Sequence, residues 1–301
     1  MNYIEILKKR AEEVNNIICV GLDPVLEKIP SEGCEEFVNK NQEPGKAISK
    51  FYIDMLQGFV DANTIPAIVK PNIAFYEQYG FEGQQALKDI INKCNNLKIP
   101  VLLDAKRGDI GKTSKAYAKA SFEFWKADAI TIAPYMGSDS VGPFTEYCDV
   151  NKEDENCTCK GVYVLCRTSN KGAIDLQNLE ITEDKIPVYM KTAEKIANEW
   201  HKVGIGAVVG ATYIKELEII SKFFVDSGKE IPLLIPGVGA QGGSAKEVVE
   251  ALKRTGNDIR LHRINSSSGI NYAYLKKIGM NYVNASVEAL KELINEIEWK
   301  M

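Results

Sequence analysis

Three charged residues follow one short apolar run and have the types and spacing that chemistry needs: Asp104, Lys106 and Asp109. In an extended segment side chains alternate, so Asp104 and Lys106 point to the same side, and Gly108 is expected to let the backbone turn and bring Asp109 back toward them. Two acids and a base held this close shift one another's pKa values, which catalytic sites exploit. Taken alone, the motif also fits a solvated surface loop with weak ion pairs.

The same arrangement, an apolar run that closes in a charged side chain, recurs along the chain. Asp23, Lys70 and Arg167 each follow such a run. The expected strands span 17–23, 67–70, 101–104, 129–133, 161–166, 206–210, 231–236 and 259–264, with helices over 47–60, 81–97, 113–125, 189–203 and 245–254. About eight strand and helix units predict an α/β fold, a single-domain TIM (β/α)8 barrel, in which the ends of the strands carry the chemistry.

We therefore expect one barrel domain over residues 1–301, with an insertion around 25–63 and a polar surface loop around 149–160. The structural alternative is an open doubly wound sheet. That fold typically has a glycine-rich turn directly after its first strand, whereas this chain has Leu22, Asp23 and Pro24 at that position.

A glycine-rich turn comes instead late in the chain, at Gly237, Gly239, Gly242 and Gly243. It lies after the seventh predicted strand and before a predicted helix. Backbone N–H groups and a helix dipole in this setting suit a phosphate, and barrels commonly bind phosphate after their seventh and eighth strands. A tight strand-to-helix turn without a ligand is the alternative.

Composition narrows the class of protein. With 37 Lys and Arg against 41 Asp and Glu, the net charge of −4 provides no basic field for nucleic acid and favours a small anionic substrate held by a local site. We find no signal-peptide pattern or membrane-spanning run and expect a cytoplasmic protein without a membrane partner. The seven cysteines suggest reduced thiols. Cys148, Cys157 and Cys159 are too few and too widely spaced to predict a metal site.

Five blocks in register resemble orotidine 5'-phosphate decarboxylase, in its longer bacterial-type branch. They are Gly21-Leu-Asp-Pro24, Lys70-Pro-Asn-Ile-Ala-Phe75, Asp104-Ala-Lys-Arg-Gly-Asp-Ile-Gly-Lys-Thr113, Pro134-Tyr-Met-Gly137 and Pro236-Gly-Val-Gly-Ala-Gln-Gly-Gly243. The resemblance implies decarboxylation of orotidine 5'-phosphate to uridine 5'-phosphate without a cofactor or metal, the last step of pyrimidine synthesis.

The resemblance also implies roles. Lys70, Asp104, Lys106 and Asp109 match the alternating charge array at the scissile carboxylate, in which Lys106 protonates the carbanion left by CO₂ while Asp104 crowds the carboxylate. The remaining implied contacts are to the ribose (Asp23 and Lys70), the pyrimidine (Ser169) and the phosphate (Gln241 and Gly242). Asp109 and Thr113 match residues given by the neighbouring subunit, which implies a homodimer with shared sites.

One position departs from the family pattern. Family members usually carry an arginine after the last strand that grips the phosphate, and the register from Asn265 places Ser268 there. A serine donates a hydrogen bond but no charge, so we expect weakened phosphate binding. Arg263 is a poor substitute because it precedes the turn.

Two other functions remain open from the residues alone. A phosphosugar lyase or aldolase on the same barrel shares the Asp-x-Lys-x-x-Asp spacing but uses magnesium, and the blocks around Lys70 and Gln241 disfavour it. A non-catalytic nucleotide-binding barrel would fit Ser268, but it has no reason to keep Asp104 and Lys106 side by side.

Overall fold

Eight parallel strands form the centre of the molecule in the computed structural model, which describes residues 1–30, 43–149, 159–239, 242–297 and 299. In spatial order they are β2 (Ile68–Pro71), β1 (Ile18–Leu22), β10 (Arg263–Ser266), β9 (Leu233–Ile235), β8 (Ile205–Val209), β5 (Gly161–Arg167), β4 (Ala129–Ile132) and β3 (Leu102–Arg107). Isolated bridges from Val69 to Val101 and from Asn72 to Asp104 bring β2 beside β3. The sheet therefore closes, and the predicted barrel is confirmed.

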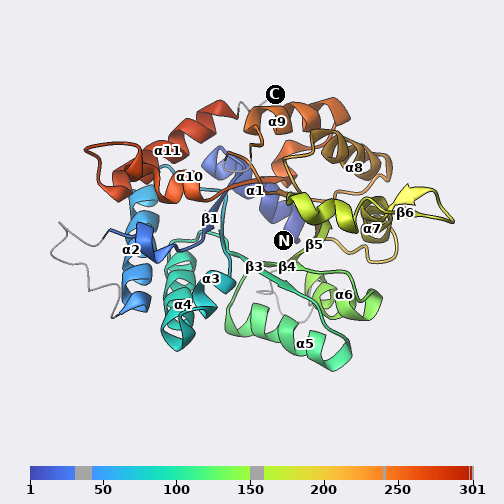
Figure 1. Cartoon of the computed structure of the whole chain (residues 1–301), viewed down its shortest axis with the longest axis horizontal. Coiled ribbons are helices and arrows are strands. Elements are labelled where there is room, and N and C mark those ends of the chain that lie inside the picture. Colours follow the sequence, from blue (N-terminus) through green and yellow to red (C-terminus); the bar gives the residue numbers. More distant parts are fainter. Residues whose placement is uncertain (31–42, 150–158, 240–241, 298, 300–301) are drawn as a thin grey trace.

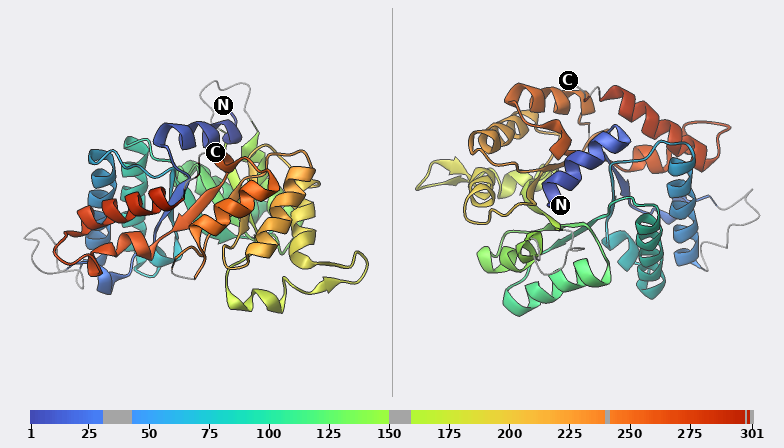
Figure 2. Two further views of the ribbon diagram at one scale, coloured as in Figure 1. Left: turned by 90° about the horizontal axis from the view of Figure 1, so that it is seen from above. Right: turned by 180° about the vertical axis from the view of Figure 1, so that it is seen from behind.

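Helices surround this barrel (Figure 1). They are α1 (Tyr3–Val14), α2 (Pro44–Asp61), α3 (Ala74–Glu77), α4 (Gly80–Asn96), α5 (Gly111–Lys119), α6 (Ser138–Thr145), α7 (Val188–Ala197), α8 (Ile214–Asp226), α9 (Ala245–Thr255), α10 (Ser268–Asn271) and α11 (Tyr282–Glu296). In the rear view of Figure 2, α1 lies across the end of the barrel at which the strands begin. A small antiparallel hairpin, β6 (Glu180–Ile181) with β7 (Ile186–Pro187), projects between β5 and α7.

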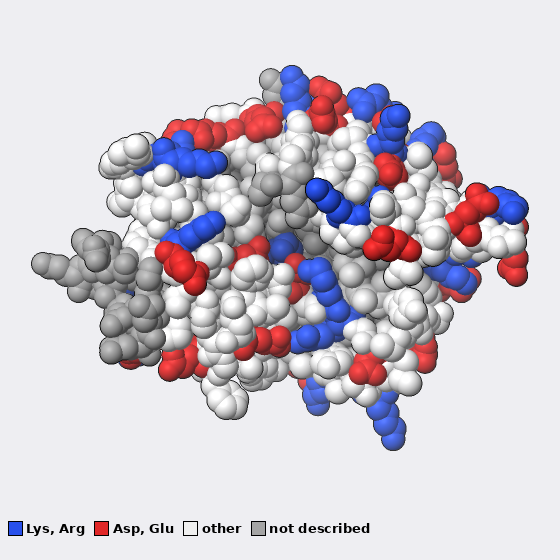
Figure 3. Space-filling model, viewed as in Figure 1, with Lys and Arg blue, Asp and Glu red and all other residues white. Residues whose placement is uncertain are grey.

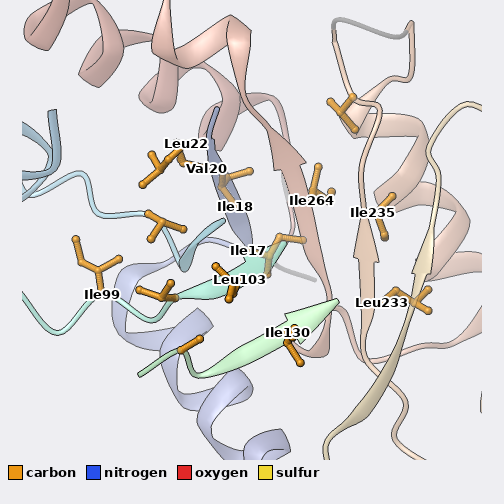
Figure 4. Packing of buried hydrophobic residues seen from close by; sticks show 14 of the residues in the cluster. Ile17, Ile18, Val20, Leu22, Ile99, Leu103, Ile130, Leu233, Ile235 and Ile264 are labelled. Atoms are coloured by element: carbon orange, nitrogen blue, oxygen red, sulfur yellow. The ribbon is translucent and has the colours of Figure 1, made fainter. Parts of the chain in front are cut away.

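Alternation along the strands divides the side chains between two environments. Ile18, Val20 and Leu22 of β1 point outward and are fully buried against the helices (Figure 4). Cys19 belongs to a second apolar cluster, with Ile68 and Leu102, that fills the barrel interior near α1. Burial of these apolar surfaces drives folding, and it leaves the opposite end of the interior to polar side chains.

Two strand boundaries differ from the prediction by more than two residues. β3 does not end at Asp104 but continues to Arg107, because a shift in register lets Arg107 pair with Ile132 beyond the first charged residues. The last strand begins at Arg263, not at residue 259. The segment before it is a 3₁₀ turn, Ile259–Leu261, since the Asp258 side chain accepts a hydrogen bond from the Arg260 amide.

Two helices are shorter than predicted. The helix expected over 113–125 begins as α5 and gives way to a π-helical turn at Ala120–Phe124. The helix expected over 189–203 ends at Ala197, because Asn198 leaves helical geometry with φ −113° and ψ −80°. Within the expected insertion, residues 31–42 lie outside the described residues, as do 150–158 of the expected surface loop. In the described chain, no helix combines the length and apolarity needed to cross a bilayer.

Candidate active site

A cavity of about 680 Å³ opens at the ends of the barrel strands, on the face opposite α1. Figure 3 shows this hollow at the centre of the molecule, with acidic and basic side chains meeting inside it. Six of the predicted site residues line it: Asp23, Lys70, Asp104, Lys106, Ser169 and Ser268. Segments distant in sequence therefore converge on one site.

Asp104 is the centre of the charged part of this cavity. Its Oδ2 atom lies 3.1 Å from Lys70 Nζ, and its Oδ1 atom lies 2.6 Å from Lys106 Nζ. Lys70 and Asp104 are buried, whereas the side chain of Lys106 is 49% exposed and faces the cavity. Asp104 and Lys106 thus lie on the same side, as expected, and this arrangement presents one ammonium group to a bound molecule.

The opposite charges of neighbouring side chains keep this cluster ionised. Burial by itself would raise the pKa of the Asp104 carboxyl, but Lys70, Lys106 and the hydrogen bonds to the carboxylate outweigh burial and hold the pKa well below its usual range. Burial likewise opposes the charged form of Lys70, but Asp104 and Asp23 raise the pKa of its ammonium above the ordinary value. Both residues are therefore charged at neutral pH.

Asp23 stands at the end of β1 and is fixed from two sides. Ser267 Oγ donates to Asp23 Oδ2 at 2.7 Å, and the Tyr272 hydroxyl donates to the Asp23 carbonyl at 3.0 Å. The Oδ1 atom of Asp23 is buried and has no hydrogen-bond partner within the described residues. An oriented carboxylate oxygen with a free acceptor position suits a hydroxyl group of a ligand.

Ser169 lies in the connection after β5, with its backbone held against the strand next to it. Thr212 Oγ1 donates to the Ser169 carbonyl at 3.1 Å. At Gly210 an added Cβ atom would come within 2.7 Å of Ser169 Cα and Cβ, so only glycine allows this approach. The serine is therefore placed by packing as well as by a hydrogen bond.

The glycine-rich turn follows the seventh barrel strand, as predicted. Gly237, Gly239 and Gly242 adopt positive φ angles of 99°, 76° and 86°, and the Gly243 amide donates back to the Gly237 carbonyl at 3.1 Å. Gly242 is not part of the cavity lining, and Gln241 lies outside the described residues. Ser268 is exposed at the cavity rim, where α10 begins.

The fold does not bring Asp109 and Thr113 into the cavity of their own chain. Asp109 Oδ1 accepts a hydrogen bond from the adjacent Ile110 amide, and neither residue belongs to the lining. The expectation that Gly108 turns Asp109 back toward Lys106 is wrong for the single chain. The left-handed backbone conformations here fall at Lys106 and Gly111, and Gly108 instead packs closely on the Ala133 carbonyl.

The two arginines considered from the sequence are both buried away from the cavity. The register of β5 with β8 shifts between Leu165 and Arg167, which turns Arg167 outward onto the Tyr213 ring. The guanidinium carbon of Arg167 lies 4.0 Å from the centroid of that ring. Arg263 lies at the opposite end of the barrel, where its guanidinium donates to the Leu7 carbonyl at 2.7 Å. The expectation that Arg263 is a poor substitute for a phosphate-binding arginine therefore agrees with its position.

Sequence reasoning missed several polar residues of the cavity. The cavity lining also contains Asn72, Thr131, Thr168, Asn170, Gln177, Asn265 and Ser267. One signal was available for Thr131, because it is the only polar residue in the apolar run 129–133 and alternates in phase with the inward-facing Ala129. Among the described residues no three His, Cys, Asp or Glu side chains form a group suited to a metal, and Cys157 lies outside them.

Comparison with known proteins gives consistent matches over nearly the whole chain. Residues 17–277 match the model described as the orotidine 5'-phosphate decarboxylase / HUMPS family. A relative from Herpetosiphon aurantiacus, named orotidine 5'-phosphate decarboxylase, is 41% identical over 248 residues, which cover 81% of this chain and 82% of the relative.

Solved structures give the same result. The OMP decarboxylase of Leishmania donovani superposes with a TM-score of 0.73 at 31% identity and full coverage of both chains. The UMP synthase of the same organism gives a TM-score of 0.74 at 34% identity, and the match covers 99% of this chain but 56% of that protein.

Proposed function

Because this chain belongs to the longer branch of the orotidine 5'-phosphate decarboxylase family and is a carboxy-lyase of that type, we propose that Lys70, Asp104, Lys106 and Asp109 perform the decarboxylation of orotidine 5'-phosphate to uridine 5'-phosphate, without a cofactor. The observation that carries this assignment is the buried Asp104 carboxylate between two ammonium groups at 3.1 and 2.6 Å.

The reaction breaks the bond between the pyrimidine ring and its carboxylate. CO₂ departs without the bonding electron pair, which stays on the ring carbon as a carbanion with no conjugated electron sink. Lys106 Nζ stabilises this charge and gives one of its protons to the carbon, after which solvent reprotonates the amine. The half-exposed position of Lys106 in the cavity supports both steps.

Asp104 contributes by repulsion in the bound state. A substrate carboxylate placed beside Lys106 also meets the Asp104 carboxylate, whose pKa is held low and which therefore stays charged. That repulsion disappears as CO₂ leaves, so it lowers the barrier relative to the bound substrate. Lys70 holds Asp104 in place and offsets the cost of burying it.

The sugar and base are held by residues around this array. The free Oδ1 acceptor of Asp23 and the ammonium of Lys70 fit the ribose hydroxyls, and Ser169 fits the pyrimidine. Gln241 and Gly242, which follow the seventh barrel strand in sequence, are proposed to contact the phosphate. Ser268 supplies no charge at the rim, so we propose that phosphate binding is weaker than an arginine at this position would give.

We also propose a homodimer with shared sites. Asp109 lies outside its own cavity, and exposed apolar side chains surround its segment: Ile110, Tyr117, Tyr135 and Met136. The segments 108–110 and 133–136 adjoin, since Gly108 packs against Ala133. An apolar surface next to an unused acid suits a second copy of the chain that receives Asp109 and Thr113.

The direct test follows the loss of orotidine 5'-phosphate absorbance with purified protein in EDTA, beside the Lys106→Ala variant. We expect turnover to survive the chelator and to disappear in the variant. Loss of activity in EDTA alone would instead support a magnesium-dependent lyase. Bound nucleotide without turnover by the folded wild-type chain would contradict the assigned array.

A further inference from the structure

A single hydroxyl group connects the two reactive side chains of β3. Thr131 of β4 is buried with 1% exposure, and its side chain reaches the cavity. Its Oγ1 atom donates to Asp104 Oδ1 at 2.7 Å and accepts from the Lys106 amide at 3.0 Å. Thr131 therefore contacts the carboxylate of one residue and the backbone of the other.

The backbone at this point is irregular. Leu103 pairs with Ile130 and Arg107 pairs with Ile132, so residues 104–106 of β3 face Thr131 alone. This β-bulge places Lys106 at φ 46°, in the left-handed region that side chains other than glycine rarely adopt. A bulged residue loses its regular ladder partner, and the Thr131 hydroxyl supplies the acceptor that the Lys106 amide needs.

We propose that Thr131 is a positioning residue that fixes the distance and orientation between the Asp104 carboxylate and the Lys106 side chain. This inference rests on the proposed function, which gives Asp104 and Lys106 their roles. Thr131 itself is not assigned a contact with the substrate.

The hydroxyl suits this task because it has one proton and two lone pairs. Donation to Asp104 uses the proton and leaves a lone pair for the Lys106 amide. Valine has nearly the same shape but offers neither bond, and serine offers both without the methyl group. Without the hydroxyl, Asp104 Oδ1 keeps Lys106 as its partner but loses a fixed donor, and the bulge loses the acceptor that maintains it.

The test compares Thr131→Val with Thr131→Ser in steady-state decarboxylation of orotidine 5'-phosphate. We expect Thr131→Val to lower kcat on the order of 10- to 100-fold, because small misplacements of reacting groups have effects of this size, with KM changed by less than about threefold. Thr131→Ser should recover most of kcat. A kcat within about twofold of the wild type for folded Thr131→Val would overturn the inference, as would equal loss in both variants.

A matched variant separates positioning from general stability. Thr255 on α9 is also buried and makes two hydrogen bonds, to the Leu252 carbonyl at 2.9 Å and with Ser221 at 2.8 Å, but it does not line the cavity. Thr255→Val should lower Tm without lowering kcat. An equal loss of kcat in Thr255→Val would show that destabilisation alone explains the Thr131 result.

Two further comparisons complete the design. Should Thr131→Val fail to fold, the kcat values of Thr131→Ala and Thr131→Ser can be compared instead, since these two variants also differ in the hydroxyl. Lys106→Ala, assayed in parallel, tests the proposed function separately. Loss of activity in Lys106→Ala with unchanged kcat in folded Thr131→Val refutes only the positioning role of Thr131. Activity retained by Lys106→Ala instead refutes the proposed role of Lys106 in decarboxylation.

Discussion

Lys70 and Asp104 form a buried ion pair across the line where the barrel closes, with 3.1 Å between Lys70 Nζ and Asp104 Oδ2. We expect Lys70→Met to destabilise the protein by about 3 kcal/mol in urea unfolding, because the buried carboxylate loses a partner. We also expect it to lower kcat on the order of 100-fold, because Asp104 is no longer held in place.

The matched control for this variant is Lys50→Met. Lys50 pairs with Asp54 at 2.9 Å on the surface of α2, where a charge pair contributes less than about 1 kcal/mol. Equal free energies of unfolding for Lys70→Met and the wild type would contradict the structural role of the ion pair.

The low pKa of Asp104 predicts a dependence of stability on pH. Because the folded pKa is depressed, this group stabilises the native state fully above its unfolded pKa of about 3.9 and loses that contribution as pH falls toward the folded value. The free energy of unfolding of the wild type should therefore fall more steeply below about pH 4 than that of Asp104→Asn, by up to about 1.4 kcal/mol for each pH unit. Parallel curves in chemical denaturation would refute the shift.

Ser268 predicts a gain of function. Ser268→Arg should lower KM for orotidine 5'-phosphate by about tenfold or more, since a charge-assisted contact to phosphate contributes about 1.5 to 3 kcal/mol. Ser268→Gln adds length without charge and should give little of this gain. Unchanged KM in Ser268→Arg would mean that another cation already holds the phosphate.

Shared active sites predict complementation between two inactive variants. Lys106→Ala and Asp109→Ala should each be inactive alone. Mixing them in equal amounts should restore up to about a quarter of the wild-type sites, because half of the dimers are mixed and each mixed dimer has one intact site. Lack of recovery after verified subunit exchange would contradict shared active sites.

The fold could be predicted from the sequence because apolar runs and helical periodicity repeat along the whole chain. Alternation predicted that Asp104 and Lys106 face the same side, but in the structure a bulge, and not regular alternation, holds Lys106 there. Arg167 could not be placed in this way, since a shift of register between β5 and β8 reverses its direction, and such a shift depends on the partner strand.

The same limit applies to the turn after β3. The left-handed residues here are Lys106, at the end of β3, and Gly111, not Gly108, because the bulge opposite Thr131 determines the backbone at Lys106. Thr131 itself lies in an apolar run, where a single threonine is typical of an ordinary strand. Local patterns thus identify the reactive side chains but not the neighbours that orient them.

The closure between β2 and β3 has one more consequence. Isolated bridges join these two strands, with backbone hydrogen bonds from the Val69 amide to the Pro100 carbonyl and from the Ile73 amide to the Asp104 carbonyl. Every other neighbouring pair forms a ladder of at least two registered residue pairs, although β3 with β4 and β5 with β8 contain a register shift. Because these bonds are isolated and do not form a continuous ladder, we expect the barrel to open readily at this seam. A nucleotide that engages Lys70 on β2 and Lys106 on β3 binds both sides of the seam, so hydrogen exchange at the Val69 and Ile73 amides should slow when it is bound.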